Sequence, residues 1–180
     1  MVAYAITDSL TLDFKCLNSD LRRFSAMSHM IVYRDKTSAF YASNAKIFLT
    51  EAKKYSFSKI LLHTDYELAY RLKADGVHLK STQFDKIKKA KALGLFTVIS
   101  THNEEEALSA QFLGADMITF SPIFETPNKG KPKGVDILKS IVSLVTPLPV
   151  IALGGILSEE QITLCEQNGA KGFASIRYFL

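Results

Sequence analysis

The chain has 180 residues and a formal net charge of +4, and 47% of its residues are hydrophobic and 22% charged. This length and composition fit one globular domain with a sizeable buried core. The charge is too small for a nucleic-acid-binding surface, and no apolar run approaches the ~20 residues of a membrane span. Cys16 and Cys165 are far apart and form no metal-binding spacing, so a reducing, cytoplasmic location is expected.

Short apolar runs alternate with longer amphipathic stretches along the whole chain. The apolar runs predict eight strands, at residues 2–6, 30–33, 60–62, 76–79, 95–99, 116–120, 149–153 and 171–174. The amphipathic stretches predict helices at residues 21–27, 38–55, 65–73, 85–93, 103–114, 135–145 and 158–169. Ser38, Asn103 and Ser158 are expected to cap the helices that follow them.

Strands that are apolar throughout are typical of a parallel sheet buried on both faces. Their alternation with helices predicts an α/β fold, and eight units predict a compact parallel (βα)8 TIM barrel, a single domain over residues 1–180. An open doubly wound sheet is the alternative, but no glycine-rich loop follows the first strand. Only residues 175–180 follow the last strand, so the last helix is expected to be missing or truncated. The apolar gap left there is a candidate homodimer surface.

In such a barrel the chemistry lies at the carboxyl ends of the strands. Polar side chains at the predicted ends of strands two, three and five are Arg34, Lys36, His63, Ser100 and His102. His102 is the candidate general acid/base, because an imidazole titrates near neutrality. Arg34 and Lys36 are two residues apart, so both point to one face of an extended segment and suit one anion. His78 lies within a strand pattern and is expected to be structural.

The last loops predict a phosphate site. Gly154 and Gly155 allow a ligand to approach the backbone, and the helix that Ser158 opens has its positive end at the same place. Arg177, after the last strand, can add a bidentate contact to phosphate. Residues 122–134, after the sixth strand, form a polar loop with Lys129, Lys131 and Lys133, which is typical of an anion-binding loop or a solvated surface loop.

Several segments together resemble the thiamin phosphate synthase/TenI family of phosphate-binding βα barrels. They are Ala-Asp-Gly-Val-His-Leu at 74–79, Ser-Thr-His at 100–102, Pro-Ile-Phe-Glu-Thr-Pro-Asn-Lys at 122–129 and Pro-Val-Ile-Ala-Leu-Gly-Gly-Ile at 149–156. The resemblance implies a thiazole phosphate ligand with its phosphate on Gly155 and on the backbone of Ile176 and Arg177. It also implies that Ser100 lines the site and that a loop closes on the ligand with Thr126, Asn128 and Lys129.

The same resemblance matches Arg34 and Lys36 to the basic pair that meets a pyrimidine diphosphate in the synthase. The synthase binds magnesium through an Asn-Asp pair after the third strand and a second aspartate after the fourth. In this chain the pair falls on His63 and Thr64, one residue short of Asp65, and the second aspartate falls on Gln83. No matched pair of carboxylates marks a metal site, with Asp8 and Asp65 as the only candidates.

TenI-type proteins lack the same ligands and aromatise a thiazole carboxylate phosphate by moving protons, with a histidine at the position of His102. The resemblance therefore favours a thiazole tautomerase of thiamin biosynthesis, an isomerase in which His102 is catalytic, Arg34 holds a carboxylate and no cofactor is needed. The alternative is a magnesium-dependent thiamin phosphate synthase, a transferase that couples hydroxymethylpyrimidine diphosphate with thiazole phosphate. A non-catalytic, regulatory barrel that binds thiamin phosphates or a partner enzyme is a third hypothesis, because Arg177 stands where the family usually has serine. All three expect a phosphorylated thiazole as partner, and neither nucleic acid nor membrane.

Overall fold

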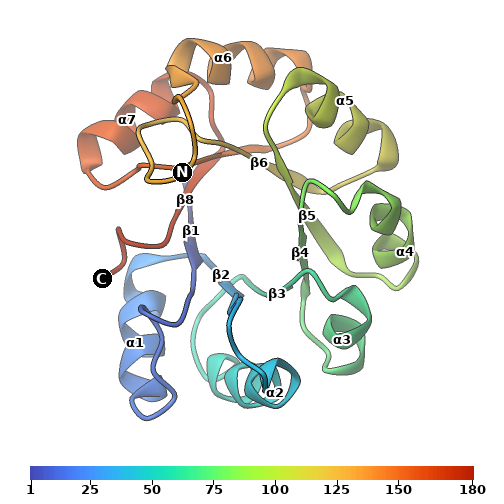
Figure 1. Cartoon of the computed structure of the whole chain (residues 1–180), viewed down its shortest axis with the longest axis vertical. Coiled ribbons are helices and arrows are strands. Elements are labelled where there is room, and N and C mark those ends of the chain that lie inside the picture. The colour runs from blue at the N-terminus through green and yellow to red at the C-terminus, as the bar shows by residue number, and fades with distance from the viewer.

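The computed structural model describes residues 1–180 and confirms the parallel TIM barrel (Figure 1). The strands follow one another around the barrel in chain order, and the last pairs with the first to close it. They are β1 (Val2–Ile6), β2 (Met30–Tyr33), β3 (Lys59–His63), β4 (Gly76–Leu79), β5 (Phe96–Thr101), β6 (Met117–Phe120), β7 (Val150–Leu153) and β8 (Gly172–Ser175). Because all are parallel, their carboxyl ends meet at one end of the barrel.

Helices surround the barrel, and each connects one strand to the next. They are α1 (Leu17–Met27), α2 (Tyr41–Ala52), α3 (Tyr66–Arg71), a 3-10 turn η1 (Phe84–Lys86) leading into α4 (Ile87–Ala92), α5 (Glu104–Leu113), α6 (Gly134–Leu144) and α7 (Glu159–Gln167). No helix follows β8, as expected. None of the helices has the length and hydropathy needed to cross a membrane.

Two predicted helix starts are wrong. Helix α1 begins at Leu17, four residues earlier than the apolar periodicity indicates, and the Cys16 carbonyl accepts the first backbone hydrogen bonds. Helix α2 begins at Tyr41 and is not capped by Ser38. Instead, the Ser38 hydroxyl accepts a hydrogen bond from the Phe40 N–H at 3.0 Å and closes a turn before the helix.

The caps predicted at Asn103 and Ser158 are confirmed. The Asn103 side chain accepts from the Glu106 N–H at 2.8 Å, and the Ser158 hydroxyl accepts from the Gln161 N–H at 3.3 Å. The Glu106 carboxylate in turn accepts from the backbone N–H of His102 at 2.7 Å. This bond ties the start of α5 to the strand end that carries His102.

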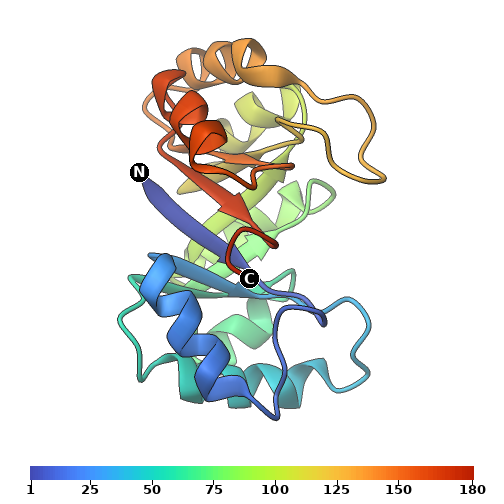
Figure 2. The same ribbon diagram turned by 90° about the vertical axis from the view of Figure 1, so that its left-hand side faces the viewer.

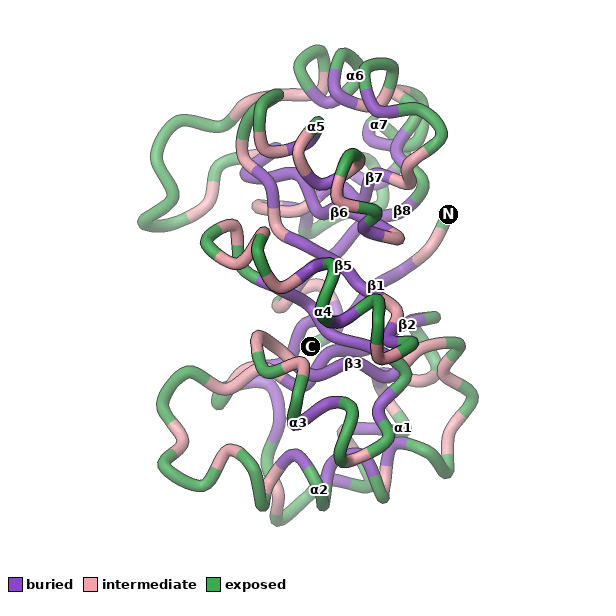
Figure 3. The backbone as a smooth tube through the Cα atoms, turned by 90° about the vertical axis from the view of Figure 1, so that its right-hand side faces the viewer, coloured by how far each residue is buried: buried purple, intermediate pink, exposed green.

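Apolar side chains form two layers. The larger lies between strands and helices, and the smaller fills the inside of the barrel. Along β1 the side chains alternate, with Ala3 and Ala5 in the outer layer and Tyr4 and Ile6 in the inner one. Both faces of the strands are therefore buried, which explains their continuously apolar sequence, and Figure 3 shows burial concentrated on the strands.

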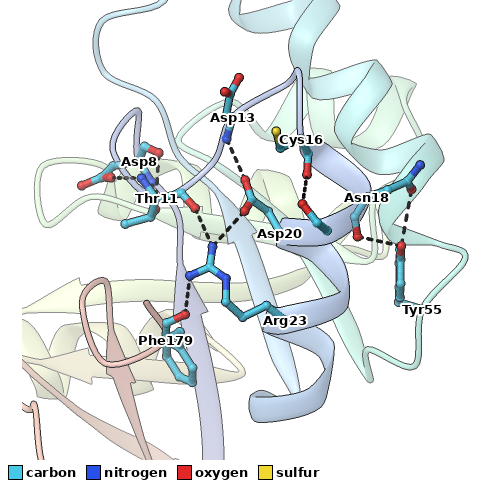
Figure 4. A network of polar contacts seen from close by, with 10 residues as sticks. Asp8, Thr11, Asp13, Cys16, Asn18, Asp20, Arg23, Tyr55 and Phe179 are labelled. Carbon is cyan, nitrogen blue, oxygen red and sulfur yellow. Dashed lines mark hydrogen bonds and ion pairs between the residues drawn. The ribbon is translucent and has the colours of Figure 1, made fainter.

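The C-terminal segment fills the gap left by the missing helix. Phe179 is fully buried, and its ring centroid lies 6.3 Å from that of Phe24 on α1 and 5.8 Å from that of Phe173 on β8. Arg23 holds the segment by donating to the Phe179 carbonyl at 2.7 Å and to Asp20 at 3.0 Å (Figure 4). The apolar gap predicted here is thus filled by the chain's own tail.

Candidate active site

A cavity of about 350 Å³ opens at the end of the barrel where the strands end, and residues at or just after the ends of all eight strands line it. The loops after β2 and β6 project beyond the barrel on this side (Figure 2). The predicted site residues that line the cavity are Arg34, Lys36, His63, Ser100, His102, Thr126, Lys129, Gly154, Gly155, Ile176 and Arg177. Asn128 is the exception. It is exposed in the loop after β6 with a left-handed φ of 61°, so it shapes the loop rather than the cavity wall.

The charge of the cavity wall has one sign. Five cationic side chains line it and no carboxylate does, the five being Arg34, Lys36, Lys80, Lys129 and Arg177. The charges of Arg34, Lys129 and Lys80, together with partial burial, lower the pKa of Lys36, with Arg34 contributing most. Burial likewise lowers the pKa of Arg34, against the opposing effect of Asp8 and Asp35. The cavity is therefore suited to polyanions.

The turn after β7 presents free backbone donors to the cavity. Gly154 and Gly155 have φ values of 100° and 69°, a conformation that favours glycine. Their N–H groups, and those of Ile176 and Arg177 after β8, donate to no other group of the protein. Converging unpaired N–H groups at the start of a helix form an anion site, so this part of the cavity suits a phosphate.

The loop after β6 is anchored on the same turn. The Ile123 N–H donates to the Leu153 carbonyl and the Phe124 N–H to the Gly154 carbonyl, both at 3.0 Å. A Cβ on Gly155 would lie 2.4 Å from the Glu125 carbonyl oxygen. The glycine is therefore required for the loop to pack against the turn and to bring Thr126 and Lys129 to the cavity.

His102 has a defined tautomer. Its Nδ1 lies 3.0 Å from the Ser121 carbonyl oxygen, which can only accept, so Nδ1 carries a proton. The Ser121 hydroxyl is 3.2 Å from the same nitrogen. In the neutral ring the basic nitrogen is then Nε2, which has no partner within the protein. Because His102 lines the cavity, it can exchange a proton with a ligand there.

His78 belongs to the site, although the sequence indicated a structural role. It is buried, it lines the cavity, its Nδ1 lies 3.0 Å from the Tyr4 hydroxyl, and its Nε2 lies 3.1 Å from the Ser100 hydroxyl. Burial raises the pKa of Tyr4 and lowers that of His78 to about 3, so Tyr4 keeps its proton and His78 is neutral. Tyr4 has no other acceptor and donates to Nδ1, so His78 donates from Nε2 to Ser100. The Ser100 O–H is left to donate to a ligand.

His63 is a second neutral histidine. Burial is the main cause that lowers its pKa to about 2, and the nearby His78, Arg34, Lys80 and Lys36 contribute. Its ring centroid lies 6.0 Å from that of His78. A histidine that cannot be protonated near neutral pH is no general acid, so His63 is suited to contacts with a ligand rather than to proton transfer.

The two candidate metal-binding carboxylates, Asp8 and Asp65, are not placed to hold a divalent cation in the cavity. Asp65 caps α3, where its carboxylate accepts from the Leu68 N–H at 2.8 Å. Asp8 accepts from the N–H groups of Leu10 and Thr11 at 2.9 and 3.1 Å, and neither aspartate lines the cavity (Figure 4 shows Asp8 with Thr11). No group of three or more His, Cys, Asp or Glu side chains is placed to hold a metal ion. Magnesium prefers carboxylate oxygens, which this cavity lacks.

Comparison with known proteins relates the chain to thiamine-phosphate synthases. A sequence model of the family described as thiamine monophosphate synthase (TMP-TENI) matches residues 3–179. The "Putative thiamine-phosphate synthase 2" of Aquifex aeolicus is 40% identical over 131 residues, which cover 71% of this chain and 69% of that protein. The thiamine-phosphate synthase of Geobacillus kaustophilus is 33% identical over 64% of this chain, and the match spans only about half (54%) of that relative.

A solved structure agrees with the sequence matches. The thiamine phosphate pyrophosphorylase from Pyrococcus furiosus superimposes with a TM-score of 0.81 at 25% identity, over 97% of this chain and 85% of that one. The match therefore extends over almost the whole barrel. Since the family model spans almost every residue from β1 to the buried Phe179, the chain belongs to the thiamine monophosphate synthase family, whose members act in thiamin biosynthesis.

Proposed function

We propose that this chain couples a pyrimidine diphosphate to a thiazole phosphate, as a thiamin phosphate synthase does. The observation that carries the proposal is that every charged side chain in the cavity wall is cationic. Its donors form two groups: the side chains of Arg34, Lys36, Lys80 and Lys129 in one, and the free N–H groups beside the glycine turn together with the Arg177 side chain in the other. Two anion sites in one cavity suit a reaction between two phosphorylated substrates, and the names of the relatives support the same activity.

The reaction is a substitution at the methylene carbon of the pyrimidine. The bond from this carbon to the diphosphate oxygen breaks and leaves its electron pair on the oxygen, while the lone pair of the thiazole nitrogen forms the new C–N bond. Negative charge grows on the diphosphate as its bond breaks. Fixed cations around the diphosphate therefore stabilise the transition state more than the bound substrate.

The direct test is a coupling assay with purified protein. Hydroxymethylpyrimidine diphosphate and thiazole phosphate are supplied together, with magnesium in the buffer, and thiamin phosphate and inorganic pyrophosphate are measured. We expect the two products in equal amounts. Binding of both substrates without product would overturn the proposal and favour the non-catalytic barrel.

The tautomerase remains a second candidate because of one observation, the tautomer of His102. In its neutral form, with the proton fixed on Nδ1 by Ser121, the imidazole has a free base at Nε2, and His102 lines a cavity suited to phosphate. Such a group can remove a proton from a carbon of a bound thiazole carboxylate phosphate and return it to another atom, with no net change in composition. The coupling reaction proposed above needs no proton transfer by His102. Tautomerisation requires His102 as the base, so the two activities depend on this side chain differently.

Replacing His102 distinguishes the two candidates. If the protein is a tautomerase, His102→Asn should lower tautomerisation at least about a hundredfold, because a positioned base contributes about that much or more. Asparagine still offers an N–H to the Ser121 carbonyl, so phosphate-ligand binding measured by calorimetry should stay within a few-fold of wild type. Tautomerisation at the wild-type rate in this variant would remove His102 from the mechanism.

A further inference from the structure

We propose that the cavity binds a diphosphate without a divalent metal, and that the ammonium group of Lys80 takes the place of the cation beside Arg34, Lys36 and Lys129. This inference rests on the proposed coupling reaction for the identity of its ligand. It concerns a side chain that the sequence pattern did not single out, and it gives a chemical reason why the metal ligands are missing.

Lys80 is held in place by the residue that occupies the second metal-ligand position. The Gln83 side-chain oxygen accepts from the backbone N–H of Lys80 at 3.0 Å, and its amide nitrogen donates to the Thr64 carbonyl at 3.2 Å. Gln83 therefore joins the loops after β3 and β4, the two loops that would carry the magnesium ligands. A side chain that would be an aspartate in the synthase here fixes the backbone of a lysine that lines the cavity.

The four cations lie close together and form no ion pair, although the carboxylates of Asp8 and Asp35 act on Arg34 from a distance. None of Arg34, Lys36, Lys80 and Lys129 forms an ion pair with a carboxylate of the protein. Repulsion from Arg34, partial burial, and repulsion from Lys129 and Lys80 lower the pKa of Lys36, in that order. Lys80 also helps to lower the pKa of His63. Like charges kept together without ion-paired carboxylates destabilise the free protein, and a polyanion bound among them relieves the repulsion.

The number of charges favours a diphosphate over a single phosphate. A substituted diphosphate carries about three negative charges near neutral pH, which four neighbouring cations can match, whereas the glycine turn offers neutral N–H donors suited to one phosphate group. The same cations would repel a magnesium ion brought into the cavity alone. Side-chain ammonium and guanidinium groups thus supply the neutralisation that a metal supplies in a carboxylate-lined site.

Binding of inorganic pyrophosphate, measured by calorimetry, tests this without depending on catalysis. We expect wild-type protein to bind pyrophosphate in EDTA, with an affinity that added magnesium does not improve more than about twofold. Lys80→Met should weaken binding about tenfold or more, because it removes one charge-assisted contact. Lys131→Met is the matched control: Lys131 is exposed in the loop after β6 and does not line the cavity, so its affinity should stay within about twofold.

The outcomes separate this inference from the proposed reaction. Pyrophosphate binding that requires magnesium, or that Lys80→Met leaves unchanged, would overturn the metal-free site even if coupling occurs. Metal-free binding that depends on Lys80, in a protein that forms no thiamin phosphate, would leave this site established and refute the coupling reaction. Coupling that proceeds in EDTA and falls in Lys80→Met would support both.

Discussion

Replacing Gly155 with alanine is expected to weaken binding of a thiazole phosphate about a thousandfold. The residue has a φ of 69°, and an added Cβ would lie 2.4 Å from the Glu125 carbonyl oxygen and 2.8 Å from the Phe124 carbonyl carbon. Both neighbours are backbone atoms, so no side-chain rotation can relieve the contact. Calorimetric titration with the phosphorylated thiazole measures the effect.

The expected loss of affinity in Gly155→Ala follows from the groups that the added Cβ would displace. The loop after β6 would have to move away from the glycine turn, and the bond from the Phe124 N–H to the Gly154 carbonyl would be lost. The turn then no longer holds its N–H groups in position. Losing two hydrogen bonds to a charged phosphate, at about 1.5–3 kcal/mol each, corresponds to roughly a thousandfold in affinity.

Gly94→Ala is the control that separates the effect of the contact between a Cβ on residue 155 and the loop after β6 from the backbone strain of a left-handed alanine. Gly94 has a similar φ of 76°, but an added Cβ there meets no atom within 4 Å, and the residue lies between α4 and β5 at the other end of the barrel. The Gly94→Ala variant should lose only the strain energy, about 1–2 kcal/mol of unfolding free energy, and should bind ligand as the wild type does. Equal losses of binding in the two variants would contradict the role given to Gly155.

The strands could be predicted from the sequence because barrel closure buries both of their faces. Val2–Ile6, Met30–Tyr33 and Gly76–Leu79 agree with their apolar runs residue for residue. The start of α1 could not be predicted from the sequence, because its first turn, Leu17 to Asp20, is mainly polar and has no helical apolar period. The role of Phe179 depends on its packing against Phe24 on α1, which is far away in the sequence, as well as against Phe173 on β8.

The candidate site, like the fold, has residues that the sequence could predict and residues that it could not. Barrel geometry alone brings His102 and the glycine turn to one end, so these were predictable. Lys80 was not, since Lys80-Ser81-Thr82 has the composition of a surface turn. The available signal was its two-residue spacing from His78, which places both side chains on the same face if the chain stays extended past the end of β4. The sequence left Asp65 as a candidate metal ligand. The structure shows that its carboxylate caps α3 instead.

Acid should destabilise the protein through His63 and His78. Their pKa values in the folded chain are about 2 and about 3, below the ordinary value of about 6.5. Between these limits the unfolded chain binds protons that the folded chain does not, so stability is fully present above pH 6.5 and falls as the pH falls. Each histidine contributes a slope of about 1.4 kcal/mol per pH unit. Urea unfolding from pH 7 to pH 5, where most carboxylates stay charged, measures the slope.

A non-titrating variant and a direct titration identify the source of that slope. His78→Gln retains an amide that can contact Tyr4 and Ser100 but binds no proton, so it should remove about half of the pH dependence even if it is less stable at pH 7. The imidazole resonances of His63 and His78 should show neutral rings down to pH 5 by NMR. Because the relay from Tyr4 through His78 to Ser100 needs a neutral ring, protonation of His78 above pH 5 would refute both the acid sensitivity and the donor role of Ser100.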